Sequence, residues 1–288
     1  MADSVPTSSN GLVPAADFAR ALTPRVSPNE VRFVSFGDLN FADADLARIV
    51  QAVPAAIAPA LQDRVFYFVP LAIAEARPVA AAEASATTLD ASPARNATLI
   101  APVYTTDLAD DAICHRNVEL PDSPTTPAHH GVFISARLLE DKFALAFEFF
   151  INIGHIFAES VGIPEVFSTL AWSQATSEVR GETSQDAFEA RTQALAHTKA
   201  DRSKLDFSKP DQPKPDEKAR ADYLESAFAD ALAIYQLSLA VDFDYSELRE
   251  REYPLLAPTA LAERLRLIAR LFPPNPGYEF AIRYRRRA

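Results

Sequence analysis

The chain has 288 residues, of which 48% are hydrophobic and 23% are charged, as in an ordinary soluble globular protein. Its formal net charge of −11 argues against a nucleic-acid partner, because nucleic-acid-binding proteins present basic surfaces. The single cysteine, Cys114, excludes an intramolecular disulfide and a multi-cysteine metal site. The glycines form neither a GxGxxG nor a P-loop motif, so nucleotide binding by those routes is not expected.

The first half of the chain shows strand patterns separated by loops and helices. Residues 1–28 are rich in Ser, Pro and Ala, and we expect a loose N-terminal arm there. Alternating or β-branched runs predict four strands, at residues 31–36, 65–69, 97–104 and 131–135. A helix is expected to begin near Asp43 or Asp45, the Ala-rich stretch 71–87 also reads as helical, and 105–130 reads as loop.

The second half is dominated by helical patterns. Four helices are predicted, the first from about Ala136 or Leu138 to Ser160 and the others at residues 164–174, 216–241 and 256–272, and a short strand is predicted at 278–284. Residues 175–218 are the least hydrophobic part, which predicts a mobile insertion with a helix near 185–197. The order of elements predicts an α+β fold, with a small mixed sheet packed against a helical bundle in one domain from residue 29 to residue 288.

Polar side chains interrupt the most apolar helix at helical spacing. Glu148, Asn152, His155 and Glu159 follow one another at offsets of four, seven and eleven residues from the first. At roughly 100° per residue they share about 60° of arc. The rest of this helix is apolar on every side, so we expect it to be buried, and buried polar groups need partners. The stripe is therefore a site, the remnant of one, or an internal hydrogen-bond network.

Two segments resemble the active-site region of zincin metallopeptidases of the gluzincin type. Residues 131–162 match the strand and the helix that carries the HExxH motif, with INIGH at 151–155. Residues 226–230, SAFAD, match the ExxxD segment of a later helix. In this family the two histidines and the later glutamate bind zinc, the first glutamate is the general base, and the aspartate orients a ligand histidine.

Carried over residue by residue, the resemblance leaves one metal ligand. Ile151 stands at the first ligand position, Asn152 at the general base, and Ser226 at the third ligand, whereas His155 and Asp230 match the family. The resemblance thus implies a zincin-like fold with a remnant site and with no catalytic residue and no bound metal. The residues of this remnant site are Glu148, Ile151, Asn152, His155, Glu225, Ser226 and Asp230.

The function expected from this is a binding or scaffold protein for an unknown protein or peptide partner. We expect a cytoplasmic location, since no basic segment followed by an apolar one opens the chain, and no membrane association, because the apolar run 143–158 is too short and too interrupted to span a bilayer. Within the remnant we expect His155 to donate to Asp230, with Asn152 and Ser226 completing the network.

Two alternatives stay open. In the first, the protein is a working metal-dependent hydrolase whose zinc site is rebuilt from His155, Glu148, Glu225 and either His129 or His130. In the second, the chain is an unrelated helical protein, and its polar stripe serves only the specificity of folding.

Overall fold

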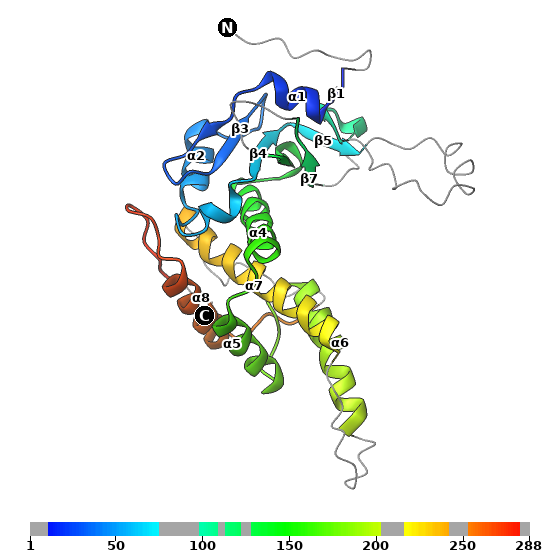
Figure 1. Cartoon of the computed structure of the whole chain (residues 1–288), viewed down its shortest axis with the longest axis vertical. Helices are drawn as coiled ribbons and strands as arrows, with labels where there is room; N and C mark the ends of the chain where they lie inside the picture. The colour runs from blue at the N-terminus through cyan, green and yellow to red at the C-terminus, as the bar shows by residue number, and fades with distance from the viewer. Residues whose placement is uncertain are drawn as a thin grey trace, which may run out of the picture. The chain divides into compact units, whose positions relative to one another are not determined.

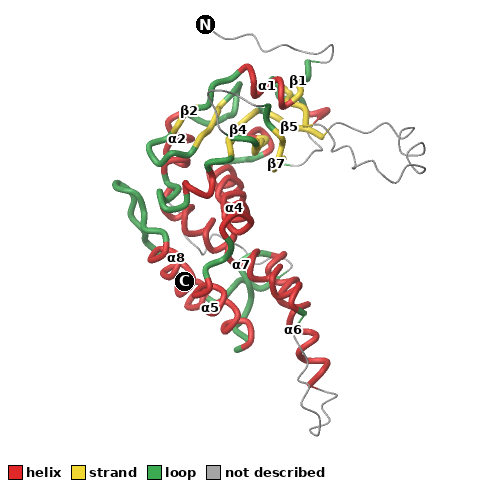
Figure 2. Tube along the Cα trace, viewed as in Figure 1, coloured by secondary structure: helices red, strands yellow, loops and turns green. Residues whose placement is uncertain are grey.

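The computed structural model of the chain describes residues 11–74, 98–108, 113–121, 128–202, 216–241 and 253–282 (Figure 1). The chain divides into two compact units, where the sequence predicted one domain. The first consists of Met1–Gln51 and Leu61–Glu148, and the second of Ala52–Ala60 and Phe149–Ala288. Every named strand belongs to the first unit, and the regular elements of the second are helices (Figure 2). The predicted α+β class is confirmed.

A mixed five-stranded sheet forms the centre of the first unit. Its strand order is β2 (Arg25–Val26), β3 (Arg32–Ser35), β4 (Arg64–Val69), β8 (His130–Ser135), β7 (Cys114–Glu119). The three inner strands are parallel, and both edge strands run antiparallel to their neighbours. The apolar runs that predicted the inner strands are buried along β4 and β8, as is typical of parallel strands covered on both faces.

Strand β7 lies in the stretch that the sequence predicted to be loop. Its sequence, CHRNVE, is polar, and none of its residues is fully buried. Its register with β8 shifts between His115 and Val118, and Asn117 adopts a positive φ of 58°. A bulge of this kind breaks the alternation by which a strand is recognised in a sequence.

A second, antiparallel sheet has the order β1 (Val13–Pro14), β6 (Thr98–Ala101), β5 (Leu71–Ala74). Strand β5 occupies the start of the Ala-rich stretch for which a helix was predicted. That prediction is wrong for residues 71–74, because they pair with β6 in the register Leu71 to Ala101. Residues 75–87 of the predicted helix lie outside the described part of the chain.

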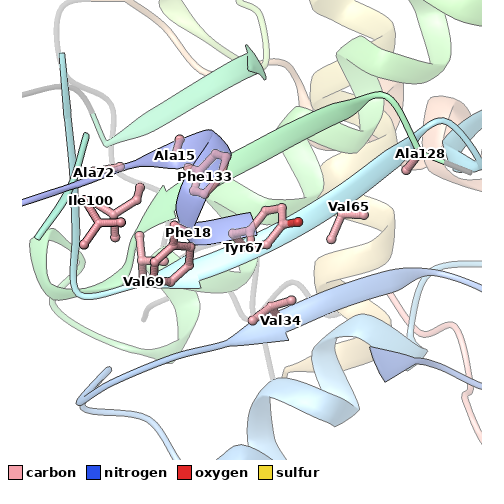
Figure 3. Close-up of a cluster of buried hydrophobic side chains, with 11 residues drawn as sticks. Ala15, Phe18, Val34, Val65, Tyr67, Val69, Ala72, Ile100, Ala128 and Phe133 are labelled. Carbon is pink, nitrogen blue, oxygen red and sulfur yellow. The ribbon is translucent and has the colours of Figure 1, made fainter. Parts of the chain in front are cut away.

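The N-terminal segment is built into the core from residue 11 onward. Helix α1 (Ala15–Ala21) places Phe18, which has no exposed surface, among buried residues of both sheets (Figure 3). The ring of Phe18 contacts Tyr67 of β4 and Phe133 of β8, whose rings stack 4.4 Å apart. The structure therefore differs from the predicted loose arm 1–28 in residues 11–28. The Ser- and Pro-rich composition of this segment gave no indication that one aromatic side chain, Phe18, anchors it in the core.

The helices fall close to their predicted places. Helix α2 covers Asp43–Gln51, and the short helices are η1 (Ala58–Leu61), η2 (Thr106–Leu108) and η3 (Ala136–Leu138). The long helices that follow are α4 (Lys142–Val161), α5 (Glu165–Thr176), α6 (Gln185–Arg202), α7 (Glu217–Ala240) and α8 (Pro258–Leu271). Helix α7 is buried along most of its length, as its apolar sequence predicts. Residues 278–282 form no strand, and 283–284 lie outside the described residues.

The predicted mobile insertion, 175–218, contains helix α6 and a buried connection. Residues 177–184 join α5 to α6, and we call this segment the α5–α6 connection. Within it Gly181, Glu182 and Thr183 are buried. Glu182 donates its backbone N–H to Pro254, and its carbonyl accepts from Leu256. The segment is held by polar contacts, which a measure of hydrophobicity does not detect. Residues 203–215 of the predicted insertion lie outside the described part of the chain.

Candidate functional site

The polar stripe of α4 is only partly buried. Asn152 is 4% exposed and lies in the interior, whereas His155 is half-buried with a side chain that is 26% exposed. Glu148 and Ile151 are also half-buried, and Glu159 is exposed. The stripe therefore runs from the protein interior to the surface.

Helices α4 and α7 touch at Gly154. A Cβ atom at this position would lie 2.7 Å from the Cα and 2.8 Å from the carbonyl oxygen of Ala229. Those atoms belong to the backbone of α7, so they cannot move aside as a flexible side chain does. Glycine at 154 thus permits a close helix contact next to His155. The sequence analysis expected α4 and α7 to lie against each other, and they do so at Gly154 and Ala229.

His155 is paired with Glu225 rather than with Asp230. Its ring Nδ1 lies 3.2 Å from Glu225 Oε1, and the side chains are 26% and 42% exposed. The sequence predicted instead that His155 would donate to Asp230. The difference arises because Glu225 lies more than one helical turn before Asp230 on α7, toward the solvent side of the contact.

Asp230 is buried and holds the α5–α6 connection. It is 5% exposed, and its Oδ2 accepts a hydrogen bond of 2.8 Å from the hydroxyl of Thr183. Burial raises the pKa of Asp230 to about 6, while hydrogen bonds from Ser184 and Thr183 and the nearby His155 oppose the rise. Glu182 on the same connection repels the charged form and adds to the rise. Asp230 thus titrates far closer to neutrality than an ordinary aspartate.

The most extensive polar network of the described residues is centred on Glu182. This side chain has no exposed surface and accepts from Arg264 of α8, with Oε2 2.9 Å from its Nη1, and from the hydroxyl of Tyr223 of α7 at 2.9 Å. Arg191 of α6 donates to Glu182 at 3.2 Å, and Arg264 also donates to Gln174 of α5 at 2.8 Å. The Glu182 carboxylate therefore joins α6, α7 and α8 directly, and Arg264 extends the network to α5.

The surroundings of Arg264 favour the charged form of its guanidinium. Burial works against the charge of Arg264, but the Glu182 carboxylate and the Tyr223 hydroxyl outweigh it and hold the pKa of the guanidinium above its usual value. Burial raises the pKa of the Tyr223 hydroxyl, which therefore remains a hydrogen-bond donor. Two guanidinium groups share one carboxylate, so each depends on Glu182.

Sequence reasoning missed this network, although one signal pointed to it. Helix α8 is amphipathic, and Arg264 lies on its apolar face, three residues after Leu261 and four before Ile268. A charged residue on the face that a helix buries requires a buried partner. Nothing comparable marks Glu182, which stands in a short polar segment.

The two histidines proposed as alternatives for a rebuilt metal site, His129 and His130, have partners of their own. His130 begins β8, and its Nδ1 lies 2.8 Å from Asp63 Oδ2 within the first unit, while His129 donates its backbone N–H to Asp63. Ser226 is half-buried on α7. Among the residues that the structure describes, no three His, Cys, Asp or Glu side chains come together as metal ligands do.

One helix of the described part, α4, is long and apolar enough to cross a membrane, with a mean hydropathy of 1.3. Half of that stretch, 50%, is buried inside the protein. A core helix of a soluble protein can pass the same test of length and hydropathy, and α4 packs on α7 at Gly154.

Comparison with known proteins gives no relative: no family model, no curated protein and no solved structure matches this chain. The function is therefore argued from the residues themselves.

Proposed function

We propose that this protein is a non-catalytic binding or scaffold protein built on a zincin-like frame, acting in the cytoplasm on a protein or peptide partner and using no metal. The observation that carries the proposal is the set of side chains on α4 beside α7. Ile151 and Asn152 stand where a zincin has a zinc ligand and its general base, and neither side chain supplies that chemistry.

The contacts of Asp230, which stands at the family's orienting position, support the same proposal. An imidazole that binds zinc presents one ring nitrogen to the metal and uses the other to donate to an orienting carboxylate. In this chain Glu225 lies at Nδ1, and Asp230, which stands at the family's orienting position, is engaged by Thr183 instead. The contacts of Asp230 thus serve the packing of the α5–α6 connection.

The test is a metal analysis of protein purified without chelators, together with a peptidase assay on unfolded protein substrates. The proposal predicts zinc far below one ion per chain and no activity above that of a mock preparation. Stoichiometric zinc with peptidase activity would refute it.

The partner is expected to bind at the exposed end of the stripe, where His155 and Glu225 reach solvent. A variant with His155→Ala and Glu225→Gln should capture less of the partner and unfold at nearly the same denaturant concentration. Glu159→Gln, on the exposed C-terminal end of α4, is the matched control. If the wild type, the double variant and the Glu159→Gln control captured equal amounts of the partner, the binding surface would lie elsewhere.

A metal-dependent hydrolase with a rearranged site is the second candidate, and one observation favours it. The His155 and Glu225 side chains lie together on adjacent helices and are both accessible, as two ligands of one ion would be. This candidate predicts that His155→Ala abolishes metal content and activity together. The first proposal predicts that neither quantity changes.

A further inference from the structure

Helix α5 is held in the second unit by one of its sides. The ring of Phe167 lies 5.2 Å from the ring of Phe228 on α7, with the two planes at 81°. Farther along the helix, Gln174 donates to the carbonyl of Ala260 on α8 at 3.2 Å. Phe167 and Gln174 are both buried, so this side of α5 faces α7 and α8.

The opposite side of α5 is open to solvent. Val166, Thr169 and Ser173 are exposed there, and Leu170 is half-buried. At roughly 100° per residue these four share about 100° of arc, and we call them the outer face of α5. Val166 is 54% exposed, and Val161, at the end of α4, is 62% exposed. They are two of the five large hydrophobic side chains that the described part of the chain exposes, and the two that belong to the second unit.

The outer face of α5 also carries no charge. The helix has one charged residue, Glu165 at its start, and the next in the chain is Glu178. Helix α8, of similar length, exposes Glu263, Arg266 and Arg270 on its solvent side. A helix that faces water usually carries charges there, whereas the centres of protein interfaces are depleted of them. The outer face of α5 therefore has the composition of a contact surface.

We propose that two copies of this chain associate through the outer face of α5, as a dimer with two-fold symmetry. Charge identifies a second copy as the occupant. Each copy has a formal net charge of −11, so two copies repel each other unless they meet through a face without charges. In a two-fold contact the same face meets itself, and an uncharged face is complementary to itself. A partner that binds through its charges would find no counter-charge on this face.

The dimer surface is separate from the exposed end of the polar stripe. On α4, Val161 lies about 200° around the helix from Glu159, the last residue of the stripe. The inference therefore does not depend on the proposed binding function. Helix α5 has 12 residues and is about 18 Å long, so one such face gives a contact at the small end of specific interfaces, below about 1,200 Å². We expect a weak dimer whose fraction rises with protein concentration.

The experiment is analytical ultracentrifugation of the full chain over a range of concentrations. The mass of the wild type should rise from 31.5 kDa toward twice that value. Val166→Glu brings two carboxylates together in the contact and should weaken association at least about 100-fold. Because Val166 is exposed, this variant should keep the circular dichroism spectrum of the wild type. Val103→Glu, at a valine that is 72% exposed on the first unit, is the matched control and should associate as the wild type does. A wild type that is monomeric at every concentration, or a dimer that Val166→Glu leaves intact, would overturn the proposal.

A cross-linking experiment tests the symmetry of the contact. Thr169 stands near the middle of the outer face, where a two-fold axis brings a residue close to its own copy. Thr169→Cys should therefore form a disulfide-linked dimer in air, and adding Val166→Glu to the same chain should suppress it. Glu189→Cys, at an exposed residue of α6, is the control and should cross-link much less. Equal cross-linking at positions 169 and 189 would contradict a specific dimer.

Discussion

Replacing Glu182 by Gln should destabilise the second unit far more than any surface substitution. The variant keeps the size of the side chain but removes the carboxylate that Arg191 and Arg264 share. The side chain of Arg264 has no exposed surface, so its charge cannot be transferred to water without unfolding. Whichever way the new amide is turned, its NH2 group faces an N–H donor of Arg264, and the two donors repel each other.

The size of the loss follows from this geometry. Removing one partner of a buried ion pair costs about 3–5 kcal/mol, because an uncompensated charge is left behind. Domains of this size are stable by only about 5–15 kcal/mol, so the loss is a large part of the total. Tyr223→Phe keeps the ion pairs and removes the hydroxyl that contacts both Glu182 and Arg264, and it should cost about 1–3 kcal/mol.

Equilibrium unfolding in urea measures both variants. The chain has a single tryptophan, Trp172, whose ring lies 6.2 Å from that of Tyr223, so its fluorescence reports the environment of the network. Glu189→Gln, an exposed carboxylate on α6, is the matched control and should change the free energy of unfolding by less than about 0.5 kcal/mol. If Glu182→Gln were as mild as this control, the network would not be the stabilising centre of the unit.

Three further predictions concern other contacts. Gly154→Ala should lower the free energy of unfolding by about 1–3 kcal/mol despite the better helix propensity of Ala, and Ala229→Gly should not restore it, since the new Cβ meets the backbone of residue 229. Asp230→Asn should stabilise the protein by roughly 2–3 kcal/mol at pH 7. Because burial raises the pKa of the Asp230 carboxyl to about 6, the free energy of unfolding of the wild type falls as pH rises from about 4 to about 6. Denaturation curves should therefore show the wild type and Asp230→Asn nearly equal in stability at pH 4. Arg25→Ala breaks an exposed pair with Asp43, held at 2.6 Å, and should change stability by less than about 1 kcal/mol in a thermal melt.

The candidate site was predictable in part. The spacing of Asn152 and His155 on an apolar helix predicted a polar stripe, and Asn152 is indeed buried. The partner of His155 was not predictable, because Glu225 and Asp230 are both acidic residues of one helix. Which of them meets the imidazole depends on how the helices are turned about their axes. That rotation is fixed by packing at Gly154 and Ala229, which no pattern of hydropathy records.

The sequence by itself determined the α+β class and the places of the long helices and inner strands, because hydrophobic periodicity is a local property that each element carries. Only the tertiary structure decided that Leu71–Ala74 is a strand, that Phe18 anchors the N-terminal segment, and that Glu182 joins three helices. Those outcomes rest on partners distant in the chain. The free energy of a buried ion pair or of strand pairing exists only once both partners are in contact.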